Sequence, residues 1–207
     1  MDESFYFSEK GKHRRTTQRE KDVAAVQYSF FKTIEDNKKY PPVTKELSNY
    51  GGVSSWVLFD LITFGQLSFF FGKLVTKKKK IVTRTLEDMN SYNERIPDEL
   101  LSSWMNAIRA LRNKVSHGMK IYGEPFTVLA KIHDGDKGYL ERVPKRSQNH
   151  LGNVLLAMRR IVMCMSLEKQ DSWNKKMAEI NHQIINNDYL SAISLGLTED
   201  WIKYFSL

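Results

Sequence analysis

The residues most able to do chemistry lie in the stretch IRALRNKVSHG, where Arg112, Asn113 and His117 fall within six positions. A guanidinium holds a phosphate through a planar fork of N–H donors, and an imidazole transfers protons near neutral pH. Together these groups can cut RNA without a metal ion. Because an arginine and a histidine often share one helix, the surrounding sequence has to support this interpretation.

A helix over residues 97–117 must present these side chains. Pro97 suits the first turn, and Gly118 suits the position just after the last turn. At 100° per residue, one apolar stripe faces the core. Its members are Leu101, Trp104, Ile108, Leu111 and Val115.

The polar residues of this helix fan out beside the stripe. Asn113 and His117 are neighbours, four positions apart, with Arg109 and Ser116 on the same side. Arg112 lies about 140° from His117, so either a bent Arg112 or a second protomer must bring both groups to one phosphate. The negative end of the helix dipole favours the charged imidazolium of His117, which suits a general acid.

The rest of the chain also predicts helices. Helical periodicity recurs over residues 16–37, 54–75, 81–92, 148–167 and 171–186. Residues 119–147 contain two β-like runs, 126–132 and 138–143, and predict a short irregular or β-hairpin insertion. The predicted fold class is therefore all-α, a helical bundle with one insertion. The predicted organisation is a basic mobile arm over residues 1–15 and a single helical domain over residues 16–207.

The net charge of +8, from 32 Lys+Arg against 24 Asp+Glu, favours a polyanionic partner such as RNA, although a basic protein without one has the same composition. Lys77–Lys80 form either a phosphate-tracking patch or a solvated helix start. The single cysteine, Cys164, excludes an internal disulfide, fits a reducing cytosol, and lies in an apolar run that predicts burial. The five histidines are scattered without cysteines at ligand spacing, so we expect no metal and no cofactor.

No secretory signal is visible in MDESFYFSEKGKHRR. Residues 56–75 approach the length of a membrane span but include Asp60, and a carboxylate near the bilayer centre is costly. We expect a buried core helix there, no membrane association and a cytoplasmic protein.

Three separated stretches resemble one family. SSWVLFDLITFGQLSFFF is similar to its pattern of Trp, apolar residues, an acid, and then Ser/Thr-Phe-Gly-x-Leu-Ser. LSSWMNAIRALRNKVSHG is similar to its Trp…Leu-Arg-Asn-x-x-x-His segment, and LGLTEDWIKYF to its closing Gly-x-x-x-x-Trp tail. Over about residues 40–207 the chain resembles the bacterial abortive-infection proteins of the AbiD/AbiF type, which are HEPN-like.

The resemblance implies a HEPN-like bundle and a phage-defence or toxin–antitoxin protein that acts as a metal-independent endoribonuclease. Arg112 would hold the scissile phosphate, His117 would act as general acid and base, and Asn113 would orient His117 or the phosphate. The implied partners are RNA as substrate, an inhibitory small structured RNA, and a second protomer in a homodimer formed through the Arg/His helix. The residues expected to contact RNA are Lys77, Lys78, Lys79, Lys80, Arg109, Lys114 and Lys120.

Asp60 and Ser116 are expected to support the site. Asp60 takes the family's acid position, and we interpret it as a buried partner of Arg109 or Arg112; the alternative is a direct catalytic acid. Family members usually have a longer N-terminal half, so the chain is expected to be a fragment, a short variant, or a protein completed by another subunit. Many members also show Ala-His-His where this chain has Ser116-His117-Gly118, and the missing second histidine favours weakened or lost catalysis.

Two other functions fit the same residues. A non-catalytic RNA-binding module would recognise a structured RNA through the basic face without cutting it. A structural dimerisation module would use Arg112 and His117 only to bridge two protomers. Cleavage that resists EDTA and needs His117 distinguishes the nuclease from both.

Overall fold

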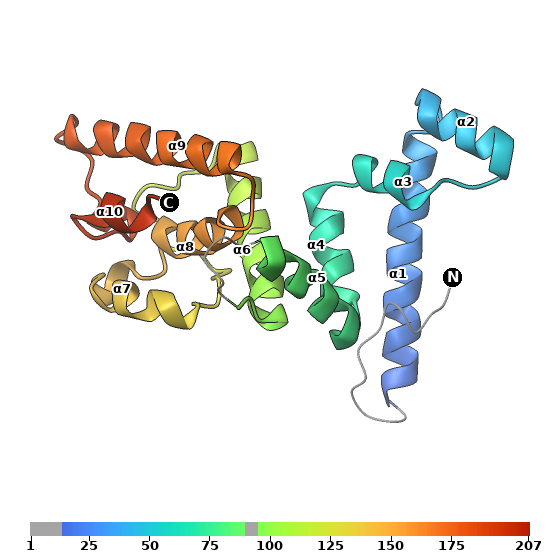
Figure 1. The fold of residues 1–207 in the computed structure, drawn as a ribbon, viewed down its shortest axis with the longest axis horizontal. Helices are drawn as coiled ribbons and strands as arrows, with labels where there is room; N and C mark the ends of the chain where they lie inside the picture. Colours follow the sequence, from blue (N-terminus) through green and yellow to red (C-terminus); the bar gives the residue numbers. More distant parts are fainter. Residues whose placement is uncertain (1–13, 90–94) are drawn as a thin grey trace. The chain divides into compact units, whose positions relative to one another are not determined.

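The computed structural model describes residues 14–89 and 95–207, and it divides the chain into two compact units, residues 1–80 and 81–207 (Figure 1). All the regular elements in the described ranges are helices, which confirms the all-α prediction. Apart from Arg14 and Arg15, where the first helix begins, the predicted basic arm lies outside the described residues. The single domain over residues 16–207 stays a prediction.

Helix α1 is the long helix of the first unit. The elements, in chain order, are α1 (Arg14–Asp36), α2 (Pro41–Tyr50), α3 (Ser55–Leu61), α4 (Phe64–Lys73) and α5 (Thr76–Met89), and the boundary of the unit falls inside α5. Helix α1 packs against α3 and α4. Phe30 of α1 lies 5.3 Å from Phe70 of α4, and Phe59 of α3 lies 5.7 Å from Phe70, ring centre to ring centre. These aromatic contacts join the three helices.

The predicted continuous helix over residues 54–75 is wrong, because Thr63 interrupts it. The Thr63 hydroxyl accepts the N–H of Gln66 at 3.2 Å, and the Gln66 amide oxygen accepts the N–H of Thr63 at 2.8 Å, which is a capping box that starts α4. The Gln66 amide group also donates to the Thr33 hydroxyl of α1 at 2.7 Å. Gln66 therefore fixes both the start of α4 and its contact with α1.

Helix α2 lies between the predicted helices over residues 16–37 and 54–75, in a segment for which we predicted no helix. Pro41 and Pro42 stand at the first helical positions, where a missing N–H costs no hydrogen bond. Gly51, with a φ of 66°, ends the helix. The two prolines thus begin a helix after stopping the previous one.

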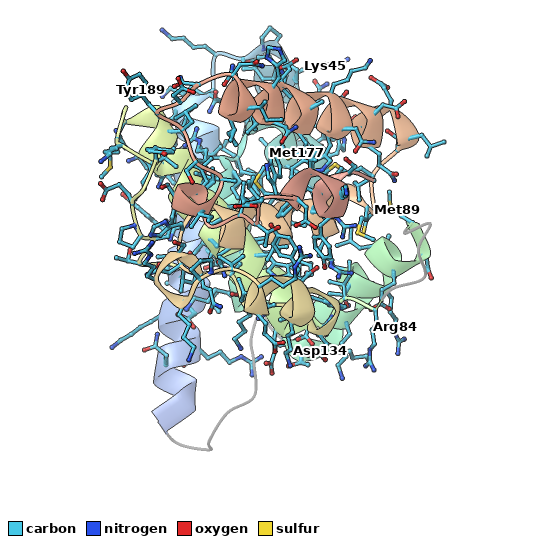
Figure 2. All side chains as sticks on the ribbon, turned by 90° about the vertical axis from the view of Figure 1, so that its left-hand side faces the viewer. Lys45, Arg84, Met89, Asp134, Met177 and Tyr189 are labelled. Atoms are coloured by element: carbon cyan, nitrogen blue, oxygen red, sulfur yellow. The ribbon has the colours of Figure 1, made fainter. Side chains whose placement is uncertain are left out.

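The second unit is built around α8. Its elements are α6 (Asp98–Ser116), η2 (Asp134–Asp136), α7 (Lys137–Glu141), η3 (Lys145–Ser147), α8 (Leu151–Val162), α9 (Leu167–Ile185), η4 (Ile193–Leu195) and α10 (Trp201–Phe205). Helix α8 contacts both α6 and α9, and α10 contacts α9. Leu156, Leu197, Trp201 and Phe205 are almost completely buried in the core. Figure 2 shows Met177 of α9 in the interior, whereas Asp134 and Tyr189 lie at the periphery.

The insertion over residues 119–147 is irregular, and the β-hairpin alternative is wrong for it. Helix α7 includes residues 138–141, four of the six residues of one predicted β-like run. In the other run, the side chain of Asn153 pairs with the backbone of Ala130, accepting its N–H at 2.7 Å and donating to its carbonyl at 3.2 Å. A buried side chain of α8 thus provides the pairing that a neighbouring strand would have provided.

A buried ion pair ties the insertion to α8. Arg160 donates to both carboxylate oxygens of Asp136, at 2.8 and 2.9 Å, and both side chains are almost fully buried. The Tyr204 hydroxyl of α10 donates to the same carboxylate at 2.6 Å. Burial raises the pKa of Asp136, and the hydrogen bond from Tyr204 opposes that shift. Burial and the hydrogen bond to Asp136 raise the pKa of Tyr204 to about 12.

Cys164 is buried, as predicted, and burial raises the pKa of its thiol. Across residues 14–89 and 95–207, no helix combines the length and the apolar character that crossing a membrane requires.

We predict that Gly152→Ala strongly destabilises the protein. A Cβ at Gly152 would lie 2.1 Å from the carbonyl oxygen of Gly196, which is backbone and cannot rotate away. The expected loss is about 3 kcal/mol or more in the free energy of unfolding, measured by urea denaturation. Gly138→Ala is the matched control, because its Cβ meets nothing within 4 Å and alanine favours the helix. Equal stabilities of the two variants would contradict the close approach.

We predict that the contribution of Tyr204 to stability disappears at high pH. Its folded pKa of about 12 lies above the ordinary value of 10.0, so this contribution is complete below pH 10 and is lost as the pH rises through 12. The shift corresponds to at most about 2.7 kcal/mol, which solvent screening reduces because the side chain is partly exposed. The stability difference between the parent and Tyr204→Phe should therefore shrink between pH 10 and 12. Tyr189→Phe, at a 91% exposed position, should follow the parent throughout.

Candidate functional site

Helix α6 carries the candidate site and is anchored through its buried face. Leu101 and Trp104 of the predicted stripe are buried, and the Trp104 indole N–H donates to the carbonyl of Lys131 at 2.8 Å. Ile108 and Leu111 are half-buried. The predicted burial of Val115 is wrong, since it is 56% exposed. Residues 115–120 are all exposed, so the last turn of α6 extends past the core.

The end of α6 has a regular hydrogen-bond pattern that fixes the backbone of His117. The Gly118 N–H donates to the Val115 carbonyl at 3.0 Å, and the Met119 N–H donates to the Lys114 carbonyl at 2.9 Å. Gly118 has a φ of 62°, a left-handed conformation that glycine adopts without strain. This is a Schellman motif, and the predicted helix end at Gly118 is confirmed.

Hydrogen bonds to other segments also fix the position of the chain after α6. The Gly123 N–H donates to the carbonyl of Ser194 at 3.2 Å, and the Phe126 N–H donates to the carbonyl of Asn149 at 2.8 Å. The Tyr122 hydroxyl donates to the carbonyl of Tyr189 at 3.1 Å. Hydrogen bonds therefore fix the chain both at the end of α6 and just after it, although the side chains of residues 115–120 are exposed.

Arg112 and Asn113 lie in the last two turns of α6, and His117 is its C-cap residue. Arg112 is exposed, and its Nη1 lies 3.5 Å from the Asn113 side-chain oxygen, at the far limit of a hydrogen bond. His117 is exposed, and no described residue forms a hydrogen bond or ion pair with its imidazole. Ser116 beside it is also exposed. The arrangement leaves a cation and a proton-transfer group open to a ligand.

Asn113 contacts Arg112, and in the described part of the chain no side-chain contact joins it to His117. The predicted orientation of His117 by Asn113 therefore has no counterpart in this structure. Orientation of a bound phosphate by Asn113 stays a prediction.

The other predicted RNA contacts of the second unit have partners already. Lys114 places its Nζ 4.6 Å from the centre of the Phe126 ring, and Lys120 forms an exposed ion pair with Glu124 at 3.2 Å. Arg109 donates to the side chain of Asn106 through Nε at 3.3 Å and through Nη2 at 2.8 Å. The sequence interpretation missed Asn106, although its position three residues before Arg109 is the spacing at which helix side chains meet.

The four lysines Lys77, Lys78, Lys79 and Lys80 belong to the first unit, in the first turns of α5. Lys79 donates to the carbonyl of Gly72 at 2.9 Å. Positive side chains at a helix N-terminus oppose the helix dipole, so this block gains nothing from its place in the helix. Such a concentration of positive charge attracts anions, which keeps phosphate binding and a solvated helix start open as interpretations.

Asp60 does not occupy the buried position that we expected. It is exposed on α3, whereas Val57 and Leu58 of the same helix face the core. In the part of the chain that the structure describes, Asp60 forms no ion pair. The expected burial of Asp60 is therefore wrong, and its pairing with Arg109 or Arg112 of the second unit stays a prediction.

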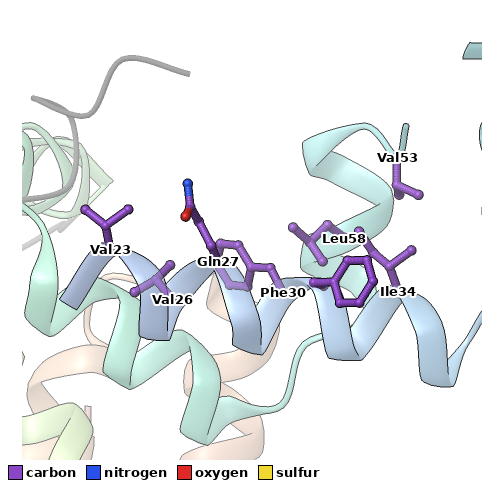
Figure 3. Close-up of a pocket in the computed structure, with 8 residues that line it drawn as sticks. Val23, Val26, Gln27, Phe30, Ile34, Val53 and Leu58 are labelled. Atoms are coloured by element: carbon purple, nitrogen blue, oxygen red, sulfur yellow. The ribbon is translucent and has the colours of Figure 1, made fainter. Parts of the chain in front are cut away.

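An apolar pocket in the first unit has a volume of about 250 Å³ and lies along α1 (Figure 3). Its lining includes Val23, Val26, Phe30 and Leu58 and contains no titratable side chain. It therefore cannot carry acid–base chemistry. In residues 14–89 and 95–207, no three His, Cys, Asp or Glu side chains are placed to hold a metal ion.

The comparisons with known proteins give one match. A family model described as "Abi-like protein" matches residues 1–123, more than half of the chain. The match includes the first two of the three stretches that carry the resemblance. It begins before the expected residue 40 and ends before LGLTEDWIKYF. No match was found among curated proteins, and none was found among solved structures.

We predict that Gly118→Ala loosens the turn that holds His117. Alanine at a φ of 62° costs about 1 kcal/mol, which the last turn can avoid by opening. The Met119 amide, which is bonded to the Lys114 carbonyl, should then exchange its hydrogen about five-fold faster. Gly72→Ala is the control, because that Cβ meets nothing within 4 Å and the φ is ordinary. Unchanged protection of the Met119 amide would contradict this account of the turn.

Proposed function

Since the chain belongs to the Abi-like protein family, we propose that it is a phage-defence protein of the abortive-infection type that cuts RNA as a metal-independent, HEPN-type endoribonuclease. Family membership supports the role in abortive infection. The observation that supports nuclease chemistry is the exposed end of α6, where Arg112, Asn113 and His117 lie within six residues of one another and the backbone is fixed by the turn.

The proposed reaction needs an RNA 2′-hydroxyl and no metal ion. A base takes the proton of the 2′-hydroxyl, whose oxygen attacks the adjacent phosphorus while the bond from phosphorus to the 5′-oxygen breaks. An acid protonates the leaving 5′-oxygen, and the products are a cyclic 2′,3′-phosphate and a 5′-hydroxyl. His117 exchanges the protons, and Arg112 stabilises the charge that develops on the phosphate.

We propose that two protomers complete this site. The step uses one group that accepts a proton and another that donates one, and the turn carries one histidine. Val115 lies two positions before His117 and Met119 two positions after it, and these side chains are 56% and 54% exposed. Exposed apolar side chains on both sides of the histidine favour burial against a second copy of the same turn. A homodimer through α6 would supply the second histidine and a second arginine.

The second candidate function is RNA binding without cleavage, with a structured small RNA as partner. The unoriented imidazole favours it, since no described carboxylate or carbonyl holds His117 in one tautomer, whereas catalytic histidines are usually oriented by such a group. Lys77, Lys80 and Arg112 are exposed and would supply the phosphate contacts.

We predict that the parent cleaves RNA in the presence of EDTA and that Arg112→Ala and His117→Ala do not. Loss of a general acid/base lowers the rate about 10²- to 10⁴-fold, and loss of the phosphate-stabilising arginine lowers it about 10²-fold or more. Single-turnover cleavage of a labelled RNA measures both effects. His182→Ala is the matched control, because His182 is also an exposed histidine in the last turn of a long helix.

Three other outcomes lead to different conclusions. Equal cleavage by the parent and both variants would show that the site assignment is wrong. Salt-sensitive binding without cleavage would support the RNA-binding module. A structural dimerisation role would be supported if the parent neither bound nor cut RNA and the variants sedimented as monomers.

A further inference from the structure

Asn106 and Arg109 form the most fully hydrogen-bonded side-chain pair on the polar face of α6. We propose that Asn106 is a positioning residue that aims Arg109 at an RNA phosphate several nucleotides away from the one that is cut. This inference rests on the proposed function, because it concerns the RNA that the end of α6 would bind. It assigns to Asn106 a role that the Arg112…His117 segment does not include.

The geometry of the pair selects one edge of the guanidinium. The Asn106 oxygen accepts from Nε at 3.3 Å and from Nη2 at 2.8 Å, so the edge formed by these two nitrogens is occupied. The opposite edge, formed by Nη1 and Nη2, keeps N–H donors whose spacing matches two phosphate oxygens. No described residue accepts a hydrogen bond from Nη1. The pair therefore holds the Arg109 guanidinium in one orientation and leaves its Nη1/Nη2 edge able to donate to a phosphate.

The charge of Arg109 is not neutralised by this contact. Asn106 is an amide, and in the described ranges Arg109 forms no ion pair. Arg109 is half-buried, whereas Arg112 is exposed and has a single contact at 3.5 Å. A partly desolvated and already ordered cation loses less side-chain entropy when it binds a phosphate. Arg109 is thus the better prepared of the two arginines for a fixed contact.

The direction of the pair separates Arg109 from His117. Asn106 lies one turn before Arg109, and His117 follows eight residues after it, about 12 Å along the axis. Contact with Asn106 directs the guanidinium towards the helix N-terminus and away from His117. At roughly 3.4 Å of axis per stacked nucleotide, 12 Å corresponds to about three to four nucleotides. Arg109 therefore reads RNA beside the cut rather than the scissile phosphate.

Substrate length tests this inference. Cleavage is measured in EDTA with a dinucleoside monophosphate, which has only the scissile phosphate, and with an oligonucleotide of about 12 nucleotides, which extends roughly 40 Å when stacked. On the longer RNA, Asn106→Ala and Arg109→Ala should raise KM about 3- to 10-fold with kcat unchanged. The dependence of log KM on log salt should lose about 0.7 in slope, the value for one phosphate contact on a single strand. On the dinucleotide, which lacks the distant phosphate, Asn106→Ala should equal the parent.

Asn106→Asp separates positioning from a merely structural role. An aspartate would hold Arg109 in place but neutralise its charge, so this variant should be as poor as Asn106→Ala on the longer RNA. If Asn106→Asp restores parental KM, Asn106 serves only to hold the helix surface together, and the inference is wrong. Equal losses on the dinucleotide and the longer RNA would also overturn it. Lys175→Ala removes an exposed lysine of α9 and controls for loss of one positive charge.

A parent that cuts neither RNA overturns the proposed nuclease and leaves the contact open to a direct measurement. A 2′-deoxy oligonucleotide of the same sequence cannot be cut by this chemistry, and its Kd is measured by fluorescence anisotropy. Weaker binding by Asn106→Ala and Arg109→Ala, with the slope change above, would support the phosphate contact. Equal binding by the parent and both variants would overturn it.

Discussion

The second unit depends on one constraint: α8 is buried along most of its length, yet it carries polar side chains that must be paired. A buried polar group without a partner costs stability, so each of these side chains requires a partner from elsewhere in the chain. Asn153 pairs with the Ala130 backbone, and Arg160 pairs with Asp136. Both partners lie in the irregular insertion. These hydrogen bonds hold the insertion against α8.

The same helix sets the position of the C-terminal segment. Gly152 approaches the carbonyl of Gly196 so closely that no side chain fits between them. This approach places Leu197, Trp201 and Phe205 in the core, where each is essentially inaccessible to solvent. Trp173 of α9 then donates its indole N–H to the Phe205 carbonyl at 2.8 Å. The C-terminal stretch LGLTEDWIKYF therefore contributes to the core.

Elements with local signals could be predicted from the sequence, and elements that depend on distant partners could not. Helix α6 begins after Pro97 and ends before Gly118, and both signals lie within it or beside it. The break at Thr63 is an exception: its capping box with Gln66 is a local signal, but the apolar residues on both sides favoured one continuous helix. The β-hairpin prediction was wrong because apolar alternation does not reveal that the hydrogen-bond partner of Ala130 is a side chain of α8.

The candidate site shows the same limit. Motif and periodicity placed Arg112 and His117 in the last turns of a helix, but periodicity also placed Val115 in the core, and the family's acid position led us to expect a buried Asp60. Burial depends on where the covering elements stop, and no local pattern records that point. Asn106 has no signal beyond its spacing from Arg109, because asparagine on a helix surface is usually solvated.

Burial of Cys164 gives this protein a practical property. The only thiol in the sequence is 2% exposed, and burial raises its pKa, so little of it is the reactive thiolate at neutral pH. A cysteine introduced at an exposed position would react with a maleimide dye or spin label, while the thiol of Cys164 would remain unmodified. Probes on each of the two units, attached without removing Cys164, would report the distance between them in solution.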